Sequence, residues 1–358
     1  MKPIYFTPGP SELYFTVNDH IRNALKKGIP SLSHRSQDFR DIHLNTTRAL
    51  RELLQLPDHY QVLFLSSSNE IWERIIQNLV EKQSFHFVNG AFSNKFYETA
   101  KLFNDETKVV RCPDGGCIDP MTVTVPENTE LISFTHNETS TGAAQPLEDL
   151  YKLRSTHPDA LISVDVSSSL PHVNLDYHKV DTVYFSVHKC FGLPAGLGVW
   201  LVNDRALEKS ERLVKANKTM ESYHSLGHLA AFAKKNQTPE TPNVLAIYLL
   251  GMVARDMLEK GIDMIRRETE YKAAVLYHCL EEHKKLSPLV MEKQYRSKTM
   301  VVAKGNDTGK YINELAKIKL VIATGYKEFQ NKQIRIANYP AHSKEHIEML
   351  ADKLLLIH

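Results

Sequence analysis

Two segments near the N-terminus carry apolar residues at helical spacing. The pattern predicts helices over residues 16–27 and 36–56, and Pro57 ends the second because proline cannot continue a helix. In the second segment the positions that recur at this spacing are Phe39, Ile42, Thr46, Ala49, Leu50, Leu53 and Leu54. The chain is therefore expected to begin with two helices before any sheet.

From residue 61 onward, short apolar runs alternate with helical periods. Strands are predicted at residues 61–65, 84–88, 131–134, 160–166, 182–187 and 198–202. Helices are predicted after the turn at 66–69, at 91–103 and near 146–155. Strands that alternate with helices favour an α/β fold, in which a largely parallel sheet is covered by helices on both faces.

A polar stretch at residues 234–243 interrupts this alternation. It is followed by a long apolar helix over 244–260 and by another helix through the 280s. The rest of the chain has an α+β pattern of two helices and short strands, predicted at 298–303, 319–323 and 333–337. We therefore predict a large domain of residues 16–250 and a small domain made of residues 1–15 and 251–358.

The composition is that of an ordinary globular enzyme. Apolar residues make up 42% and charged residues 24% of the 358 residues, which argues against disorder and allows a large core. The net charge of +2 gives no reason to expect a nucleic acid or an anionic membrane as a partner. The chain lacks both an apolar run of roughly eighteen residues and the apolar core of a signal peptide, so we expect a cytoplasmic protein.

The four cysteines do not suggest a disulfide framework in a chain of this length. Cys112 and Cys117 enclose the sequence Pro-Asp-Gly-Gly, which is wider than the usual gap in a zinc half-site. No second Cys/His pair is present to complete four ligands. We interpret the segment as a Gly-rich hairpin turn and expect no metal site.

The most informative stretch runs from Ser186 to Lys189, where an apolar run leads directly into a loop rich in Gly and Pro. A second apolar run, residues 160–164, ends in Asp165. A lysine amine can condense with the aldehyde of pyridoxal phosphate, and a carboxylate can keep the pyridine nitrogen protonated so that the ring accepts electrons. The alternatives are a surface position for Lys189 and a helix-capping role for Asp165.

Other candidates follow other predicted strands, where open α/β sheets bind their ligands. Ser67, Ser68 and Asn69 form a strand-to-helix turn that suits a phosphate, although helix capping is the alternative. Phe92 could stack on a pyridine ring, or pack in the core as single aromatic residues more often do. Residues 136–142 offer short polar side chains to a ring hydroxyl or a phosphate.

Together these residues give the chain a resemblance to the class V (fold type I) pyridoxal-phosphate aminotransferases, and among them to the phosphoserine aminotransferases. The matching motifs cover nearly the whole chain: Thr7-Pro-Gly-Pro10, Ser33-His34-Arg35, His136-Asn-Glu-Thr139, Asp165-Val-Ser-Ser168, His188-Lys189 with Gly192-Leu-Pro-Ala-Gly196, Thr241-Pro242 and Arg335. Each motif alone is modest evidence, whereas seven in the family's order are strong evidence. The resemblance implies a fold type I enzyme with a mostly parallel central sheet and a smaller α+β C-terminal domain.

The resemblance also implies roles toward the cofactor. Lys189 would form the Schiff base with pyridoxal 5'-phosphate and move the proton, and Asp165 would pair with the pyridinium nitrogen. Phe92 would stack on the ring, and Thr139 would bond the ring hydroxyl. The residues implied to line the phosphate are Ser67, Ser68, Asn69 and His188, with Thr241 from the second subunit of a homodimer.

For the substrates, small amino acids and 2-oxo acids, the resemblance places His34 and Arg35 at the substrate anion and Arg335 at the α-carboxylate. A planar guanidinium on a short strand suits that task, because it can make two parallel bonds to a carboxylate. The expected reaction is transamination between phosphoserine and 2-oxoglutarate in serine biosynthesis.

The sequence departs from the phosphoserine aminotransferases where the substrate would bind. Glu70 stands where they carry an arginine, His188 where they carry a glutamine, and Tyr326-Lys327 replaces an anion grip of the His-x-Arg type. The loss of guanidinium groups weakens the assignment of a phosphorylated substrate. Because residues 136–142 are also similar to the serine- and alanine-glyoxylate (serine-pyruvate) aminotransferases, that activity is the alternative.

Two other classes of function fit the sequence less well. A cysteine desulfurase needs a cysteine on a mobile loop late in the chain, and no cysteine follows Cys279. A cofactor-free regulator of the same fold would be expected to have lost Lys189 or Asp165, and both are present.

Overall fold

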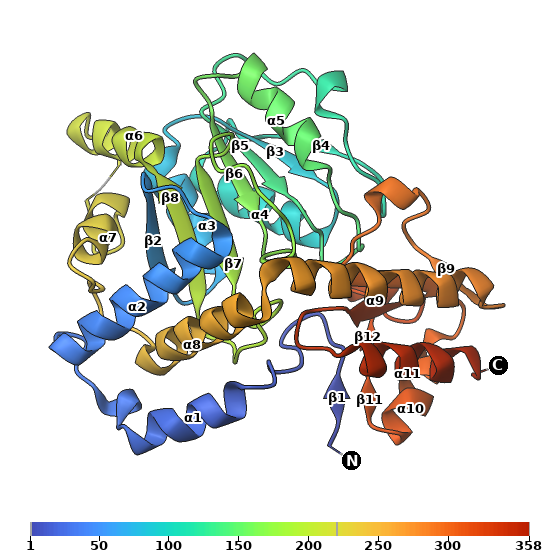
Figure 1. Ribbon diagram of the computed structural model, residues 1–358. Coiled ribbons are helices and arrows are strands. Elements are labelled where there is room, and N and C mark those ends of the chain that lie inside the picture. The colour runs from blue at the N-terminus through green and yellow to red at the C-terminus, as the bar shows by residue number, and fades with distance from the viewer. Residues whose placement is uncertain (1, 220, 358) are drawn as a thin grey trace.

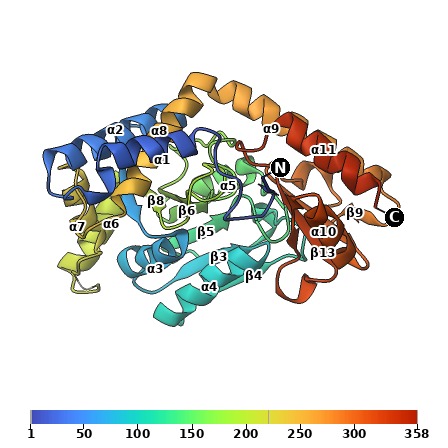
Figure 2. The same ribbon diagram turned by 90° about the horizontal axis from the view of Figure 1, so that it is seen from below.

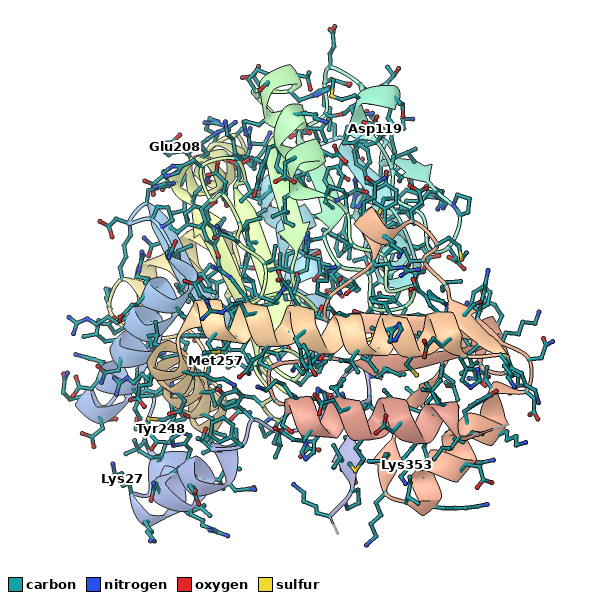
Figure 3. All side chains as sticks on the ribbon, turned by 45° about the vertical axis from the view of Figure 1, so that its right-hand side comes forward. Lys27, Asp119, Glu208, Tyr248, Met257 and Lys353 are labelled. Atoms are coloured by element: carbon teal, nitrogen blue, oxygen red, sulfur yellow. The ribbon has the colours of Figure 1, made fainter. Side chains whose placement is uncertain are left out.

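The computed structural model describes residues 2–219 and 221–357. A seven-stranded sheet forms the centre of the molecule, and a smaller group of strands and helices packs beside it (Figure 1). Polar residues such as Lys27, Glu208 and Lys353 point outward at the periphery (Figure 3). No helix in the described part of the chain is long and apolar enough to cross a membrane.

The elements follow one another along the whole chain. The helices are α1 (Val17–Lys26), α2 (Gln37–Leu54), α3 (Ser68–Leu79), α4 (Ala91–Phe103), α5 (Leu147–Thr156), α6 (Asp204–Lys215), α7 (Leu226–Ala233), α8 (Val244–Lys260), α9 (Ile262–Glu282), α10 (Thr308–Lys317) and α11 (Lys344–Leu355). The strands are β1 (Ile4–Tyr5), β2 (Tyr60–Leu65), β3 (Ser84–Val88), β4 (Lys108–Arg111), β5 (Leu131–Thr135), β6 (Leu161–Asp165), β7 (Thr182–Ser186), β8 (Gly198–Asn203), β9 (Leu286–Pro288), β10 (Met300–Gly305), β11 (Leu320–Val321), β12 (Ala323–Thr324) and β13 (Gln333–Ala337).

Side-chain caps fix where several of these helices begin. Ser36 accepts a hydrogen bond from the backbone N–H of Phe39 at the start of α2, and Asn243 accepts one from that of Ala246 at the start of α8. Such caps satisfy backbone donors that have no partner within the helix. At the other end of α2, Gln55 adopts a left-handed conformation with φ of 54°, which ends the helix before Pro57.

The large sheet has the strand order β2-β8-β7-β6-β5-β3-β4. β8 is antiparallel to both of its neighbours, and the other strands run parallel to one another. Because β5, β6 and β7 are buried along their whole length, they read as continuous apolar runs rather than as alternating patterns.

Helices cover both faces of this sheet, as Figure 2 shows with α1, α2 and α8 on one side and α3 and α4 on the other. One apolar cluster joins Phe64 and Val183 to α2, α5 and α8. A second cluster joins Leu63 and Tyr184 to α3, α4, α6 and α7. Neighbouring residues of one strand therefore belong to opposite faces, because successive side chains of a strand point in opposite directions.

A separate apolar cluster holds the C-terminal part together. It packs Ile334 and Ile336 of β13 against α9, α10 and α11, and it includes Ile4 and Phe6 from the N-terminus. The strands here form a four-stranded antiparallel sheet, β12-β13-β10-β9, and a parallel pair of β1 with β11. Ile4 and Phe6, near the start of the chain, thus pack with its C-terminal part.

After β1 the chain packs against the loop that follows β7. The hydroxyl of Tyr339 donates to the carbonyl of Pro8 at 2.7 Å, and the N–H of Tyr14 donates to the carbonyl of Gly192 at 2.8 Å. Between them, Gly9 has φ of +141°, and a Cβ at this position would lie 2.9 Å from Cγ of Lys189. Only glycine combines this backbone conformation with this close approach.

The structure confirms the predicted α/β class, and most predicted elements lie within two residues of the observed ones. The strand predicted at 319–323 is wrong in one respect, because β11 and β12 belong to two different sheets. The pattern also did not predict β4, α6 or α7. β4 and α7 are short, which leaves little room for a period. Helix α6 does have an amphipathic pattern, with Ala206, Ser210 and Leu213 buried, and it was overlooked.

The segment from Cys112 to Cys117 forms a turn, in which the N–H of Gly116 donates to the carbonyl of Pro113 at 2.9 Å. The predicted hairpin is wrong, because β4 pairs in parallel with β3 and the chain continues into a short 3-10 helix at Pro120–Thr122. Two parallel strands such as β3 and β4 cannot be joined by a tight hairpin, because the chain must first cross back to the other end of the sheet. All four cysteines are free.

The centre of the large sheet should dominate stability. Ile162 in β6 is fully buried, so we expect Ile162→Ala to lower the free energy of unfolding by about 2–5 kcal/mol. Leu102→Ala is the control, because Leu102 is 84% exposed, and it should change the free energy by less than about 0.5 kcal/mol. Urea denaturation measures both, and equal effects would contradict this description of the core.

Candidate functional site

The predicted site residues follow strands whose carboxyl ends meet at one edge of the large sheet. Thr135, the last residue of β5, pairs with Asp165 at the end of β6, and Asp165 pairs with Tyr184 in β7. Residues just past these strands therefore lie side by side although they are far apart in the sequence. Lys189 follows β7 by three positions and enters the same space.

Lys189 is buried, and its amine makes two hydrogen bonds within this space. Nζ donates to Oγ1 of Thr139 at 2.8 Å and to Oγ of Ser168 at 3.1 Å. The two hydroxyl oxygens lie 2.5 Å from each other. The loops after β5, β6 and β7 thus converge on one amine, and the surface position considered for Lys189 is wrong.

Burial is the main influence on both charged groups. It lowers the pKa of the Lys189 amine, while the negative charge of Asp165 acts in the opposite direction. Burial raises the pKa of the Asp165 carboxyl, and Lys189 and the hydrogen bonds from Ser167 oppose that shift. The N–H of Ser167 donates to Oδ1 of Asp165 at 2.8 Å. A lysine with a lowered pKa is closer to the neutral form that acts as a nucleophile or base.

The ring of Phe92 faces the amine, with Nζ of Lys189 5.0 Å from the ring centroid. Phe92 also packs against the apolar cluster on the α3–α4 face, as the core position considered for it requires. Its backbone N–H donates to both carboxylate oxygens of Glu138, at 3.2 and 3.1 Å. Phe92 therefore forms one wall of the space around Lys189.

The turn after β2 opens helix α3. Ser67 caps the helix by accepting from the N–H of Glu70, and Asn69 is exposed in the first turn. Ser68 is buried, with its N–H bonded to Oγ of Ser186 at 3.0 Å and its hydroxyl 3.0 Å from that of Ser167. Ser67 therefore caps α3, while Asn69 in the same turn remains exposed at the positive end of the helix dipole.

Glu70, the acid that replaces an arginine, folds back onto the turn. The N–H and hydroxyl of Ser66 donate to Oε2 of Glu70 at 2.9 and 2.6 Å, and Arg74 lies 3.6 Å from Oε1. Burial alone would raise the pKa of Glu70, but Ser66 and Arg74 hold it below its ordinary value. The negative charge of Glu70 is therefore stabilised by the hydrogen bonds from Ser66 and by the nearby Arg74.

His188 directly precedes Lys189 and is partly buried. Burial and the nearby charge of Lys189 lower the pKa of His188 to about 4, so the ring is neutral at neutral pH. Its Nδ1 atom is buried and has no hydrogen-bond partner within residues 2–219 and 221–357. Such an unpaired buried polar atom is costly unless a ligand satisfies it.

Strand β13 contributes Arg335. Nε of Arg335 donates to the carbonyl of Thr324 at 2.9 Å, so its terminal nitrogens are not needed for that bond. The guanidinium lies 5.5 Å from the ring centroid of Tyr326, and that ring lies 5.5 Å from the ring of Phe92. Through these contacts Arg335 joins the surroundings of Lys189.

Two lysines approach the same tyrosine. Nζ of Lys95 lies 5.2 Å and Nζ of Lys327 lies 6.0 Å from the ring centroid of Tyr326. We call Lys95, Lys327 and Arg335 the Tyr326 cation cluster; none of the three forms an ion pair with another described residue. A cavity of about 310 Å³ borders Lys95, Tyr326 and Lys327.

His34, Arg35 and Thr241 come together elsewhere. The guanidinium of Arg35 donates to the carbonyls of Thr238 and Pro239 at 2.7 and 2.6 Å, and Nδ1 of His34 lies 3.4 Å from Oγ1 of Thr241. No hydrogen bond or ion pair between described residues links these three to Lys189. Within one chain, Arg35 holds the loop that carries Thr241.

The sequence did not reveal every residue of the site. Ser168 and Glu138 stand inside motifs that were noted, but no role was assigned to them. Lys95 was missed altogether, although it follows Phe92 at the i+3 spacing that places two residues on one face of a helix. These contacts depend on how loops from different strands meet, which spacing alone does not show.

Comparisons with known proteins agree with this geometry. Residues 5–350 match the Aminotransferase class-V family. Two curated relatives are named phosphoserine aminotransferase. The protein from Nocardioides sp. is 28% identical over 353 residues and covers 96% of this chain and 92% of its own length. The protein from Rhodococcus opacus is 26% identical over 332 residues and covers 90% and 86%.

Solved structures give the same picture. A crystal structure of a phosphoserine aminotransferase SerC from Cytophaga hutchinsonii has a TM-score of 0.96, is 47% identical and covers 98% of both chains. An alanine–glyoxylate aminotransferase from Nostoc sp. has a TM-score of 0.79 and 22% identity, and covers 100% of this chain and 95% of its own. At 22% identity, the similarity to the Nostoc protein shows only that the two proteins share a fold.

Buried histidines should make stability depend on pH. Burial lowers the pKa below the ordinary 6.5 in each of the following: to about 4 in His43, His136, His172 and His188, and to about 3 in His86 and His342. The unfolded chain therefore binds protons at a higher pH than the folded chain. Stability should fall as the pH drops below 6.5, by up to about 1.4 kcal/mol per pH unit for each histidine.

His188→Asn tests one of these contributions. Between pH 6.5 and 4 we expect its unfolding free energy to fall less steeply with pH than that of the wild type, because one of the shifted groups is absent. Leu102→Ala, in which the replaced side chain is exposed and carries no titrating group, should keep the wild-type slope. Urea denaturation across this pH range provides the slopes, and equal slopes for all three proteins would contradict the prediction.

Proposed function

Because the chain belongs to the class V aminotransferase family, we propose that it is a phosphoserine aminotransferase that uses pyridoxal 5'-phosphate. It would transfer an amino group between phosphoserine and 2-oxoglutarate, a step of serine biosynthesis, in the cytoplasm. The family implies the cofactor. Support for the substrate comes from the 47% identical structure and from the curated relatives, which carry that name.

The residues of the site fit the proposed cofactor. The observation that carries the proposal is the buried amine of Lys189, held by Thr139 and Ser168 beside Asp165 at the carboxyl edge of the sheet. The unpaired Nδ1 of His188 and the open first turn of α3 suit a phosphate. An exposed lysine without an acid beside it would not fit.

Each residue has a physical role in this proposal. When bound, pyridoxal phosphate supplies an aldehyde that takes over the amino group and a ring that accepts electrons. Nζ of Lys189, brought toward neutrality by burial, would hold the cofactor and later move the α-proton of the substrate. Asp165 would hold a proton on the ring nitrogen, and Thr139 would bond the ring hydroxyl. Phe92, whose ring faces Nζ of Lys189, would cover one face of the ring.

The phosphate would lie at the turn of α3. Ser67, Asn69 and His188 face it in this proposal, and Ser68 holds the turn through Ser186 and Ser167. The first-turn N–H groups and the positive end of the helix dipole favour an anion there. Since Glu70 is bonded to Ser66 and lies near Arg74, the helix terminus remains open to a phosphate.

The choice of substrate rests on the Tyr326 cation cluster. An amino acid with an uncharged side chain, such as alanine or serine, offers one carboxylate, which Arg335 alone can bind. Phosphoserine, glutamate and 2-oxoglutarate carry a second anionic group, and Lys95 and Lys327 remain for it. This charge favours phosphoserine over the serine- or alanine-glyoxylate alternative.

We also propose a homodimer in which each subunit completes the site of the other. His34, Arg35 and Thr241 form one unit that makes no hydrogen bond or ion pair with Lys189 of the same chain. Thr241 would bond the cofactor phosphate of the second subunit, and His34 and Arg35 would lie near its substrate. We propose that a large and a small domain meet at this shared site. The separate apolar clusters support two domains, although Val253, Met257 and Ile265 still belong to the cluster of the large sheet, which favours a division later than residue 250.

Half-reactions with single amino donors test the function. Phosphoserine and glutamate should each change the visible absorption of the bound cofactor, at least about tenfold faster than alanine or serine, because a charge-assisted bond is lost with the latter. Stopped-flow absorbance measures these rates. Lys189→Ala is the control and should fold yet show no conversion. Faster conversion by alanine or serine would assign the enzyme to the glyoxylate branch instead.

Mixing two inactive variants tests the shared site. Lys189→Ala and Arg35→Ala homodimers, unfolded and refolded together, should recover up to about a quarter of wild-type activity, because half the dimers are mixed and each has one intact site. Each variant refolded alone is the control. If Arg35 serves the site of its own chain, no mixed dimer contains an intact site, and the absence of recovery would refute the arrangement.

A further inference from the structure

Glu138 is a fully buried carboxylate that the sequence left without a role. It follows β5 by three positions and directly precedes Thr139, which bonds Lys189. Glu138 forms no ion pair with any lysine, arginine or histidine of residues 2–219 and 221–357. A buried charge without a counter-ion is costly unless hydrogen bonds satisfy it, so its surroundings must supply donors.

Those donors come from the start of α4 and from the next residue in the loop. Phe92 N–H lies 3.2 and 3.1 Å from the two oxygens. The N–H and hydroxyl of Ser93 both donate to Oε2 at 3.0 Å. The N–H and hydroxyl of Ser140 donate to Oε1 at 3.1 and 2.8 Å. Every lone pair that the carboxylate can offer is therefore directed at a donor.

The carboxylate occupies the N-terminus of α4, where the helix dipole favours a negative charge. Ser140 strengthens the junction, because its hydroxyl also accepts the N–H of Ala91 at 2.9 Å. The fit is close: a Cβ at Gly90 would lie 2.3 Å from Cγ of Glu138 and 2.7 Å from Oγ of Ser140. The loop after β5 and the first turn of α4 thus form one rigid unit.

This unit carries two walls of the cofactor site. Thr139 lies on the loop and contacts the amine of Lys189, and Phe92 lies in the helix turn with its ring 5.0 Å from that amine. Phe92 is connected to the loop through Glu138, since its N–H bonds only that carboxylate among the described residues. The separation of the stacking ring from Thr139 therefore depends on Glu138.

We infer that Glu138 is a positioning residue, which fixes the ring of Phe92 relative to Thr139 and Lys189 so that the cofactor ring fits between them. The inference rests on the proposed function, since it concerns the same site. Glu138 touches neither substrate nor the reacting atoms and acts through Phe92. Burial lowers the pKa of Lys189, and the charges of Asp165 and Glu138 oppose that shift, so the loss of Glu138 has an electrostatic effect that can be measured separately.

Glu138→Gln is the informative variant. Glutamine has the same size but no charge, and its NH₂ group would face N–H or O–H donors wherever it points. The matched control is Glu130→Gln. Glu130 stands just before the opposite end of β5 and accepts the N–H groups of Glu81, Lys82 and Gln83, so it also anchors a loop, but away from the site. Unlike Glu138 it has a counter-ion, Lys209.

The dissociation constant of pyridoxal 5'-phosphate from each cofactor-free protein provides the first measurement, by quenching of protein fluorescence. We expect Glu138→Gln to bind about tenfold or more weakly than the wild type, and Glu130→Gln to stay within about twofold. The second measurement is the pH midpoint of the visible absorption of the bound cofactor. It should fall in Glu138→Gln, because a negative charge near Lys189 is lost, and remain unchanged in Glu130→Gln.

The melting temperatures of the cofactor-free proteins separate positioning from simple loss of stability. If both variants melt lower than the wild type but bind the cofactor with the same constant and midpoint, Glu138 is only structural and the inference is wrong. If the wild type itself binds no pyridoxal phosphate, the proposed function fails instead.

Should Glu138→Gln not fold, Ser93→Ala keeps the carboxylate and removes one of its donors. It should weaken cofactor binding by about threefold to tenfold, because one hydrogen bond to a charged group is lost, with little change of the midpoint. An unchanged dissociation constant in a folded Ser93→Ala protein would also overturn the inference.

Discussion

The burial of one amine is the constraint on which the arrangement of this protein depends. Lys189 is removed from solvent, and its Nζ needs acceptors that only neighbouring loops can provide. Thr139 comes from the loop after β5, Ser168 from the loop after β6 and Lys189 itself from the loop after β7. Three parallel strands in adjacent positions are thus required for a single hydrogen-bonded group.

Two helices begin at the same edge of the sheet, and they use their N-termini differently. The first turn of α4 is filled by Glu138, a carboxylate of the chain itself. The first turn of α3 has small polar residues, and its acid, Glu70, bonds Ser66 outside the helix. An internal anion at one helix leaves the other as the favoured place for an external one. The sheet edge therefore has one helix N-terminus that an internal carboxylate fills and one that it does not.

The cleft between the two packing units brings the remaining charge to the site. Arg335 lies on β13, whose Ile334 and Ile336 belong to the apolar cluster of the C-terminal part. Lys95 lies on α4, a helix that covers one face of the large sheet. Both meet the ring of Tyr326. Because the cations come from different units, a ligand with two anionic groups would bind both sides of the cleft. A change in the relative position of the units would then alter binding.

The sequence by itself determined the order of elements around the site, because buried parallel strands are continuous apolar runs and their ends are marked by residues such as Asp165 and Lys189. It also indicated Phe92 and Thr139 by their place after strands. Only the tertiary structure decided that Glu138 anchors Phe92, that Ser168 bonds Lys189 and that Arg35 holds the loop of Thr241. Those contacts join residues separated by tens to hundreds of positions, and their geometry follows from how loops cross, which no local pattern encodes.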